Sequence, residues 1–479
     1  MRRSLRLILT LALLAVTVRV YAYTIPYEAW MGAYVASKKI GYLCYKIDKS
    51  DLADASIYKI TSVMNNHMNV LGVDLTQVID TTVYTDAKYN PLKETFSMSS
   101  GGKSTTVIAT FKPDTVECEM SGSTGSSKQR VPIPKGVTLV GDAMFTSPDL
   151  KMEIGKEYSQ YYFNPLTMSI DTLKIKAEGR EKITVNGKEY DALIVTNSTT
   201  MGDMKVWQTD DDDVLKITAM MGITMIREDK EKAMSGVESG KSDDFAVLTS
   251  LKPDRKIEEP RSVKSLNIVL KGITERSLVI SDSRQKADFV KGQSDTVRLR
   301  INASRFKASK SVYLPVDRGK FGTDLASTPY INCDVQAVKD QAKMIVGNEK
   351  NAYKACCRLR DWVHANMEPR ADIGITRSAS DVLQSRVGVC RDYGILLAGL
   401  ARAAGIPTRI AAGVVYTNGA FYYHVWVDCY VGEWVPFDAT LSTDFVDATH
   451  IKMAGGDATS MFGLSKVIGS LKAEIKSYK

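Results

Sequence analysis

Residues 388–407 read GVCRDYGILLAGLARAAGIP, and this stretch predicts a helix that begins at Cys390. Apolar side chains recur in it with helical spacing, at Leu396, Leu397, Leu400 and Ala404. Gly405 followed by Pro407 is a typical helix end. The unpaired N–H groups and partial positive charge at a helix start stabilise a thiolate, so the Cys390 sulfur is a candidate nucleophile.

A thiolate nucleophile needs a base, and the base needs a group that orients it. His424 lies within FYYHVWVDCYV (421–431), a strand pattern that puts Trp426 and Asp428 on the same face as the imidazole. A turn at Gly432 returns the chain through EWVPFDAT (433–440), which would bring Asp438 alongside His424. The sequence therefore predicts a catalytic triad of Cys390, His424 and Asp438.

The chain has three other histidines, and none has the same surroundings. His67 has no acid beside it, His364 ends a predicted helix and is expected to face solvent, and His450 is assigned to a tail after the last strand.

Each triad residue also has a purely structural interpretation. A cysteine at a helix start is often a packing residue, a mid-strand histidine is often a satisfied core group, and an aspartate near a strand end is often a cap. A zinc site is the other functional interpretation, but the spacing is not one of the usual ligand patterns. We expect no metal and no cofactor.

Three stretches together resemble the transglutaminase-like superfamily in its bacterial exported branch: SASDVLQSRVGVCRDYGILLAGLARAAGIPTRIAAGVVY, FYYHVWVDCYVGEWVPFDATL and FVDATHIKM. The resemblance extends over 325–479 and implies a papain-like α+β core with Cys390, His424 and Asp438 as nucleophile, base and orienting acid. The chain departs from the usual pattern beside the nucleophile, at Arg391-Asp392-Tyr393, a variable place that affects specificity more than the triad.

Four further residues are candidate substrate contacts. They lie beside the nucleophile or around the histidine: Arg391, Tyr422, Tyr423 and Trp426. The alternative for the aromatic residues is that they pack on the sheet.

The triad chemistry passes through a thioester, and the group that attacks this thioester defines the enzyme. Water would make it a protease or amidase, whereas a lysine amine would make it a protein-glutamine acyltransferase. The resemblance also covers members without activity, so the alternative is a non-catalytic binding or scaffold module of the cell envelope. The expected partners are a peptide or protein substrate and cell-envelope components.

At 479 residues the chain is too long for one compact core, and its pattern changes along its length. Residues 23–250 mostly alternate with period two, and Asn186-Gly187 between two alternating runs is a strong hairpin signal. Within 251–479 two runs with helical spacing, 334–347 and 351–366, precede the nucleophile helix and the strands after Pro407. The prediction is α+β: a β-rich antiparallel N-terminal domain, which could also carry a hydrophobic ligand, followed by helices packed with an antiparallel sheet.

Residues 1–22 have a basic start, a short apolar run and small residues at the end, the pattern of a cleaved signal peptide. We therefore expect a periplasmic or secreted protein with no membrane span after cleavage. The formal charge of +8 is 63 minus 55, and removing the four arginines of this segment leaves 59 minus 55, or +4. No basic stripe remains, so nucleic-acid binding is not expected. The seven cysteines are an odd number and contain no C-x-x-C pair, which leaves at least one thiol unpaired.

Overall fold

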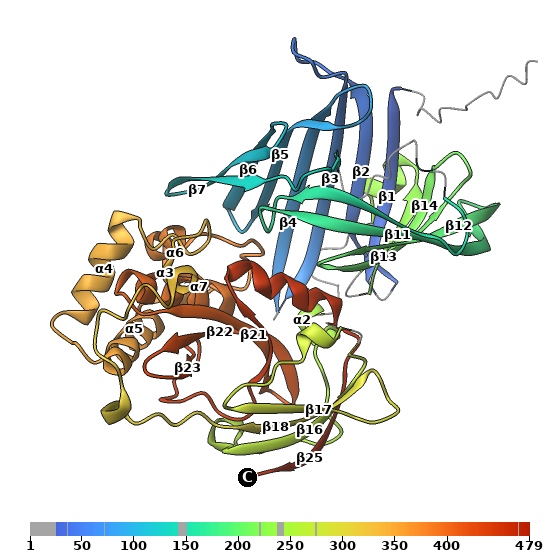
Figure 1. Ribbon diagram of the computed structural model, residues 1–479. Helices are drawn as coiled ribbons and strands as arrows, with labels where there is room; N and C mark the ends of the chain where they lie inside the picture. Colours follow the sequence, from blue (N-terminus) through green and yellow to red (C-terminus); the bar gives the residue numbers. More distant parts are fainter. Residues whose placement is uncertain are drawn as a thin grey trace, which may run out of the picture.

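The computed structural model describes residues 25–479 apart from 36, 71, 142–149, 151, 220–221, 237–243, 274 and 468 (Figure 1). The expected signal peptide, residues 1–22, lies outside the described residues. The fold class is α+β, as predicted: a large β-sheet formed by the N-terminal half and a C-terminal half of helices and smaller sheets.

The N-terminal half forms one sheet of fifteen strands in the order β8-β7-β6-β5-β4-β3-β2-β1-β15-β14-β13-β12-β11-β10-β9. The strands are β1 (Tyr27–Val35), β2 (Lys38–Lys49), β3 (Tyr58–Val70), β4 (Val73–Thr85), β5 (Pro91–Ser100), β6 (Lys103–Phe111), β7 (Thr115–Gly122), β8 (Gly125–Pro132), β9 (Leu139–Val140), β10 (Glu157–Asn164), β11 (Ser169–Val185), β12 (Lys188–Thr199), β13 (Gly202–Gln208), β14 (Val214–Thr218) and β15 (Ile223–Glu228). Neighbouring strands pair antiparallel, with the parallel pair β9–β10 as a departure from the predicted pattern. The Asn186-Gly187 hairpin is confirmed, because β11 and β12 pair from Val185 and Lys188 outward and both turn residues have positive φ.

The two halves of this sheet curve toward each other. Phe111 at the end of β6 contacts Phe163 of β10 edge to face, with ring centroids 6.0 Å apart. Between β1–β2 and β12–β14 the curvature leaves an apolar pocket whose empty volume, including its opening to solvent, is about 570 Å³. The short helices α1 (Lys230–Met234) and α2 (Phe245–Leu248) follow the sheet and lead into the C-terminal half.

The C-terminal half contains two four-stranded sheets. The first has the order β17-β18-β16-β25 and the second β23-β22-β21-β24. Their strands are β16 (Ser265–Lys271), β17 (Gln285–Phe289), β18 (Thr296–Asn302), β21 (Thr408–Thr417), β22 (Ala420–Tyr430), β23 (Trp434–Phe437), β24 (Ile451–Gly456) and β25 (Lys472–Tyr478). The sequence analysis missed β24 and β25.

Four helices pack together beside the second sheet, and the predicted helices are confirmed. They are α4 (Gln336–Val346), α5 (Ala352–Asn366), α6 (Ala379–Ser385) and α7 (Cys390–Ala403). The remaining short elements are α3 (Gly322–Leu325), the two-residue strands β19 (Glu368–Pro369) and β20 (Val387–Gly388), and 3₁₀ turns at Pro260–Ser262, Arg276–Leu278, Ala308–Lys310 and Ala458–Lys466. Helix α7 packs on β21 and β22, and its apolar side chains are fully buried. The face of α5 with Ala352, Cys356, Leu359 and Val363 is likewise buried, in the core that positions α7.

A single apolar core runs through both halves of the chain. It includes Phe96 and Val107 from the large sheet as well as Leu397 of α7 and Val425 of β22. The halves therefore bury apolar surface against each other. The domain limits at residues 23, 250 and 479 remain a prediction. None of the helices in the described part of the chain has the length and hydrophobicity that a bilayer crossing requires.

Candidate active site

The start of helix α7 shows why a glycine precedes Cys390. The Asp392 carboxylate turns back over the helix start and accepts a hydrogen bond from the Val389 N–H at 3.0 Å. A Cβ at Gly388 would lie only 2.5 Å from the Asp392 Cβ and Oδ2 atoms, so a side chain at 388 would displace this cap. Gly388 and Asp392 together fix the backbone that carries the Cys390 sulfur.

The Asp392 carboxylate is fully buried and is neutralised by a buried arginine. Arg377 Nη2 lies 3.0 Å from Asp392 Oδ1, and the side chains of both residues are almost inaccessible to solvent. The other donors of Arg377 bond Ser385 Oγ at 2.8 Å and the Val387 carbonyl at 2.6 Å. The guanidinium therefore ties α6, the strand before the nucleophile and the first turn of α7 together.

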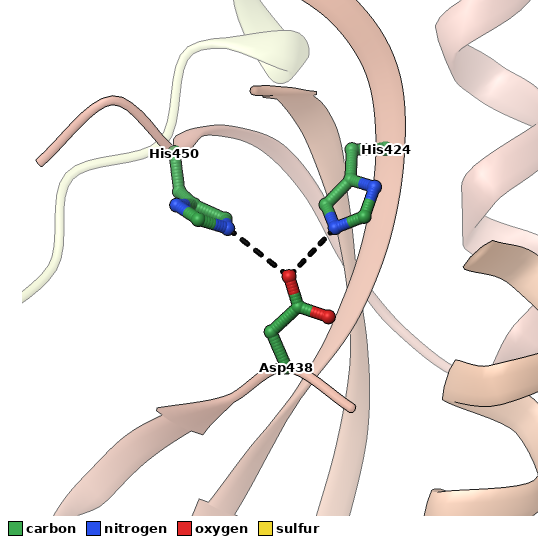
Figure 2. Close-up of side chains that lie close together, drawn as sticks. All are labelled: His424, Asp438 and His450. Atoms are coloured by element: carbon green, nitrogen blue, oxygen red, sulfur yellow. Dashed lines mark hydrogen bonds and ion pairs between the residues drawn. The ribbon is translucent and has the colours of Figure 1, made fainter. Parts of the chain in front are cut away.

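His424 and Asp438 form the predicted pair. His424 Nε2 lies 2.7 Å from Asp438 Oδ2, and the Thr440 N–H donates to Asp438 Oδ1 at 2.7 Å. Figure 2 shows the imidazole of His424 directed at the carboxylate. Both side chains are buried, so the carboxylate fixes the ring orientation in a site that water does not screen.

Cys390 completes the predicted set of three. Because His424 Nε2 bonds Asp438, the ring nitrogen left for the sulfur is Nδ1, and the Cys390 side chain lies close enough to His424 to influence its pKa. Burial by itself would lower the pKa of His424, but the charge and hydrogen bond of Asp438, together with the contact to Cys390, raise it to about 10. The pKa of Asp438, which burial would raise, is held well below its usual range by His424 and His450. The buried Asp438 carboxylate therefore favours the protonated form of His424 at neutral pH, next to the Cys390 sulfur.

Figure 2 also shows a residue that the sequence analysis assigned wrongly. His450 is not in an exposed tail: it precedes β24, is 0% exposed, and its Nε2 lies 3.2 Å from the same Asp438 oxygen. Its Nδ1 lies 3.4 Å from Asp447 Oδ1, and Arg261 Nη1 lies 3.0 Å from Asp447 Oδ2. Asp438 is thus held between two imidazoles, and the second imidazole is itself held by a buried carboxylate. The available signal was Asp447 three residues before His450, within the stretch FVDATHIKM.

The four candidate substrate-contact residues lie at different positions around His424 and Cys390. Trp426 is 1% exposed and its ring lies 6.1 Å from that of His424 and 5.4 Å from that of His450, so it lines the inner side of the site. Arg391 donates through Nη2 to the carbonyls of Ile373, at 3.1 Å, and Ile375. Burial and the nearby Cys390 raise the pKa of Tyr423, and the side chains of Tyr422 and Tyr423 are both partly exposed.

The first turn of α7 also offers hydrogen-bond donors. The N–H groups of Asp392 and Tyr393 both bond the Val389 carbonyl, at 2.8 and 3.2 Å. Within the described residues, those of Cys390 and Arg391 form no hydrogen bond to a group outside the helix. They are available for the oxygen of a carbonyl that the sulfur attacks.

His424, Asp438 and His450 are also the residues that could hold a metal ion, because their ligand atoms lie within 4.8 Å of one another. However, both Nε2 atoms are already directed at one oxygen of Asp438. The hydrogen bonds satisfy the carboxylate without an ion, so this donor set suits proton handling better than metal coordination.

Comparison with known proteins finds two family matches along the chain. Residues 339–439 match the transglutaminase-like superfamily, and residues 26–226 match a family of unknown function, DUF3108. The chain thus carries a transglutaminase-like core in its C-terminal half, as the sequence motifs indicated. This match supports a cysteine-dependent role for the core.

Two solved structures are similar to parts of this chain. A candidate cysteine protease from Cytophaga hutchinsonii is 19% identical with a TM-score of 0.30, over 45% of this chain and 86% of that one. A candidate protease from Parabacteroides distasonis is 13% identical with a TM-score of 0.20, over 75% of this chain and 68% of that one. No curated protein matches the chain.

The pKa values of the histidine–aspartate pair predict how stability varies with pH. The folded pKa of His424 is about 10, above its ordinary 6.5, so its contribution is complete below pH 6.5 and is lost as the pH rises through about 10. The pKa of Asp438 is lowered from 3.8, so its contribution is present above pH 3.8 and is lost as the pH falls further. Both contributions are complete between pH 3.8 and pH 6.5. We expect the difference in thermal unfolding temperature between the wild type and Asp438→Asn to be largest in that range. A difference that is equal at pH 6 and above pH 10 would contradict this.

His450 is predicted to act as a positioning residue for Asp438. His450→Phe removes the donor at 3.2 Å, so Asp438 and His424 can shift, and we expect alkylation of Cys390 by iodoacetamide to slow about 10-fold at pH 6.5. His450→Gln keeps a donor and should restore part of the rate. The matched control is His364→Phe, because the exposed His364 contacts only the Ala439 carbonyl, at 3.0 Å, beside the same aspartate. Equal rates in the two phenylalanine variants would exclude the role.

Proposed function

We propose that the protein is an exported cysteine enzyme that acts on peptide-type amide bonds through a thioester. Cys390 is the nucleophile, His424 the acid and base, and Asp438 the group that orients His424. The observation that carries the proposal is the buried His424, which bonds Asp438 through Nε2 and lies beside Cys390 at the start of a helix.

The reaction follows from these positions. The Cys390 thiolate attacks the carbonyl carbon, and the N–H groups of Cys390 and Arg391 stabilise the negative oxygen. The carbon–nitrogen bond breaks as His424 Nδ1 donates its proton to the leaving amine, and an acyl thioester remains. Water or a lysine amine then attacks the thioester, His424 takes a proton from it, and the Cys390 thiolate leaves.

Hydrolysis is the form of the reaction that we favour, because water is always present and needs no second binding site. Incubation with a glutamine-containing protein and a dansylated amine separates the two outcomes. Stable incorporation of the dansyl group would show acyl transfer to an amine, whereas release of new peptide ends or of ammonia without incorporation would show hydrolysis.

The rate of alkylation by iodoacetamide from pH 4 to 9 tests the thiolate directly. We expect rapid labelling of Cys390 at pH 6.5 in the wild type and a fall of about 100-fold in His424→Ala, since a thiol of ordinary pKa near 8.5 is only about 1% ionised there. A wild-type rate that rises only near pH 8.5 would mean an ordinary thiol. That result would favour the alternative, a non-catalytic scaffold module of the cell envelope.

Export to the periplasm or the medium belongs to this proposal. The basic start and short apolar run of residues 1–22 support it. Cell fractionation with N-terminal sequencing of the mature protein tests it, with Tyr23 as the expected first residue. A full-length chain in the cytoplasmic fraction would oppose it.

A second activity is favoured by the pocket in the large sheet. Its walls are mostly apolar, with Met31 and Leu43 facing Met204 and Ile217, and Asn197 is buried there with its Oδ1 lacking a hydrogen-bond partner. We propose that it binds a small molecule with an apolar body and one hydrogen-bond donor. A shift in unfolding temperature with medium-chain alkanols, lost in Met204→Trp, would support this. The absence of any shift would oppose it.

A further inference from the structure

One extended segment connects the large sheet to the nucleophile. It consists of residues 372–376, named here the strap, and leads through Arg377 into α6. On one side its backbone carbonyls accept hydrogen bonds from three side chains of the large sheet. Gln77 Nε2 donates to the Gly374 carbonyl at 2.8 Å and Thr105 Oγ1 to that of Thr376 at 3.0 Å, and Ser100 Oγ shares its one proton between the Asp372 carbonyl at 3.1 Å and the Thr76 carbonyl at 2.8 Å.

These three donors form one row on the concave face of the sheet. Gln77 of β4 is directly opposite Ser100 of β5, and Thr105 of β6 is opposite Met98, two residues from Ser100 and therefore on the same face. The fit is tight, because a Cβ at Gly374 would lie 3.0 Å from the Leu75 side chain and a Cβ at Gly101 2.5 Å from the Asp372 carbonyl. The strap is therefore held by a preformed set of donors rather than by loose contact.

The carbonyls in between are directed the other way, toward the nucleophile. Those of Ile373 and Ile375 both accept from Arg391 Nη2, and Arg391 follows Cys390 directly. The strap thus alternates its carbonyls between the sheet and the residue next to the reactive sulfur. It continues into Arg377, which pairs with Asp392 of the same helical turn.

A second anchor fixes the far end of this segment. The Asp381 carboxylate of α6 accepts from Ser123 Oγ at 2.9 Å and from the Thr124 N–H at 2.7 Å, in the turn between β7 and β8. Burial would raise the pKa of Asp381, but these hydrogen bonds, with that of Ser378, lower it. The large sheet therefore holds the chain before Cys390 at both ends.

We propose that the large sheet positions the nucleophile through the strap, so that Gln77, Ser100 and Thr105 are positioning residues for Cys390. The inference rests on the proposed role of Cys390 as nucleophile. It means that the DUF3108-like sheet and the transglutaminase-like core form one catalytic unit, in which the sheet sets where Arg391 and the first turn of α7 lie.

The test uses the full chain with Gln77→Leu and Thr105→Val combined, which removes two donors and keeps the side-chain volumes. Thr105→Ser keeps the hydroxyl and should behave as the wild type. Two controls are matched: Thr106→Val makes the same change one residue along β6 on the opposite face, and Tyr330→Phe removes a contact between the halves, to the Leu166 carbonyl at 2.9 Å, that does not involve the strap.

We expect the double variant to lower the rate constant for alkylation of Cys390 about 10-fold and to increase amide hydrogen exchange in 388–393, with both controls unchanged. Equal effects in Tyr330→Phe would mean that the donors merely join the two halves, and unchanged exchange in the double variant would overturn the proposal. The exchange measurement does not depend on reactivity. If the alkylation of the wild-type thiol shows ordinary pH dependence, the proposed function is excluded. The exchange measurement still decides whether the strap positions the helix.

Discussion

The Cys390→Ala variant should lose amide-bond turnover by about 10⁴-fold or more while keeping its fold. Groups that act as one catalytic unit cannot replace each other, and without the sulfur no thioester can form. The side chain is only partly buried, and α7 keeps its cap from Asp392 and its apolar core contacts, so the unfolding temperature should change little. The assay follows cleavage of a pooled library of fluorogenic peptide amides by wild type and variant.

The matched control for this experiment is Cys357→Ala, because Cys357 is the other partly buried thiol of the chain and lies in α5. It should keep the wild-type rate. Turnover that survives in Cys390→Ala would show that another group performs the reaction. A wild type that cleaves no member of the library, with an unreactive thiol, would favour the scaffold alternative.

The sequence was sufficient to place Cys390, its helix and the strands beside it, because the signals there are local. Helical spacing, the Gly405 stop and the alternation around His424 each depend on a few neighbouring residues, and the hairpin at Gly432 brings Asp438 back within 14 residues. The hairpin brings Asp438 near His424, although β23 ends at Phe437 and Asp438 reaches the histidine from just beyond the strand.

His450 could not be predicted in the same way because its partners come from distant segments. Arg261 reaches Asp447 from 186 positions earlier, and β24 joins the sheet beside β21 rather than beside β23, which precedes it in the chain. The contacts of the strap could not be predicted for the same reason. The side chains that donate to its carbonyls lie, in most cases, about 270 residues earlier in the sequence. The alternation of residues along one strand shows which face its side chains lie on. It does not show which backbone carbonyls of a distant segment those side chains will bond.

The contacts around the site share one chemical feature: they fix the backbone and carboxylates around the sulfur rather than the sulfur itself. Asp392 caps the helix, Asp438 holds His424, and Asp447 holds His450, and each carboxylate is buried against a positive or hydrogen-bonding partner. Buried charges of this kind are costly when one partner is lost. The site therefore couples activity to stability at the start of α7.

Arg377→Ala should accordingly destabilise the protein far more than the loss of an exposed arginine. Removing the guanidinium leaves the fully buried Asp392 carboxylate without its partner 3.0 Å away, a change that costs about 3–5 kcal/mol in buried pairs. Arg377→Lys should recover only part of this, because one ammonium cannot also bond Ser385 and the Val387 carbonyl.

The matched control is Arg300→Ala, which removes an arginine paired with Asp288 at 2.7 Å on the exposed surface of the C-terminal half. Because solvent screens such a pair, its loss should cost no more than about 1 kcal/mol. Urea unfolding of the full chain, followed by intrinsic fluorescence, compares the variants through the shift of the transition midpoint. Similar shifts for Arg377→Ala and Arg300→Ala would mean that Asp392 finds another partner or a proton. In that case the cap, rather than the ion pair, would be what keeps the first turn of α7 in place.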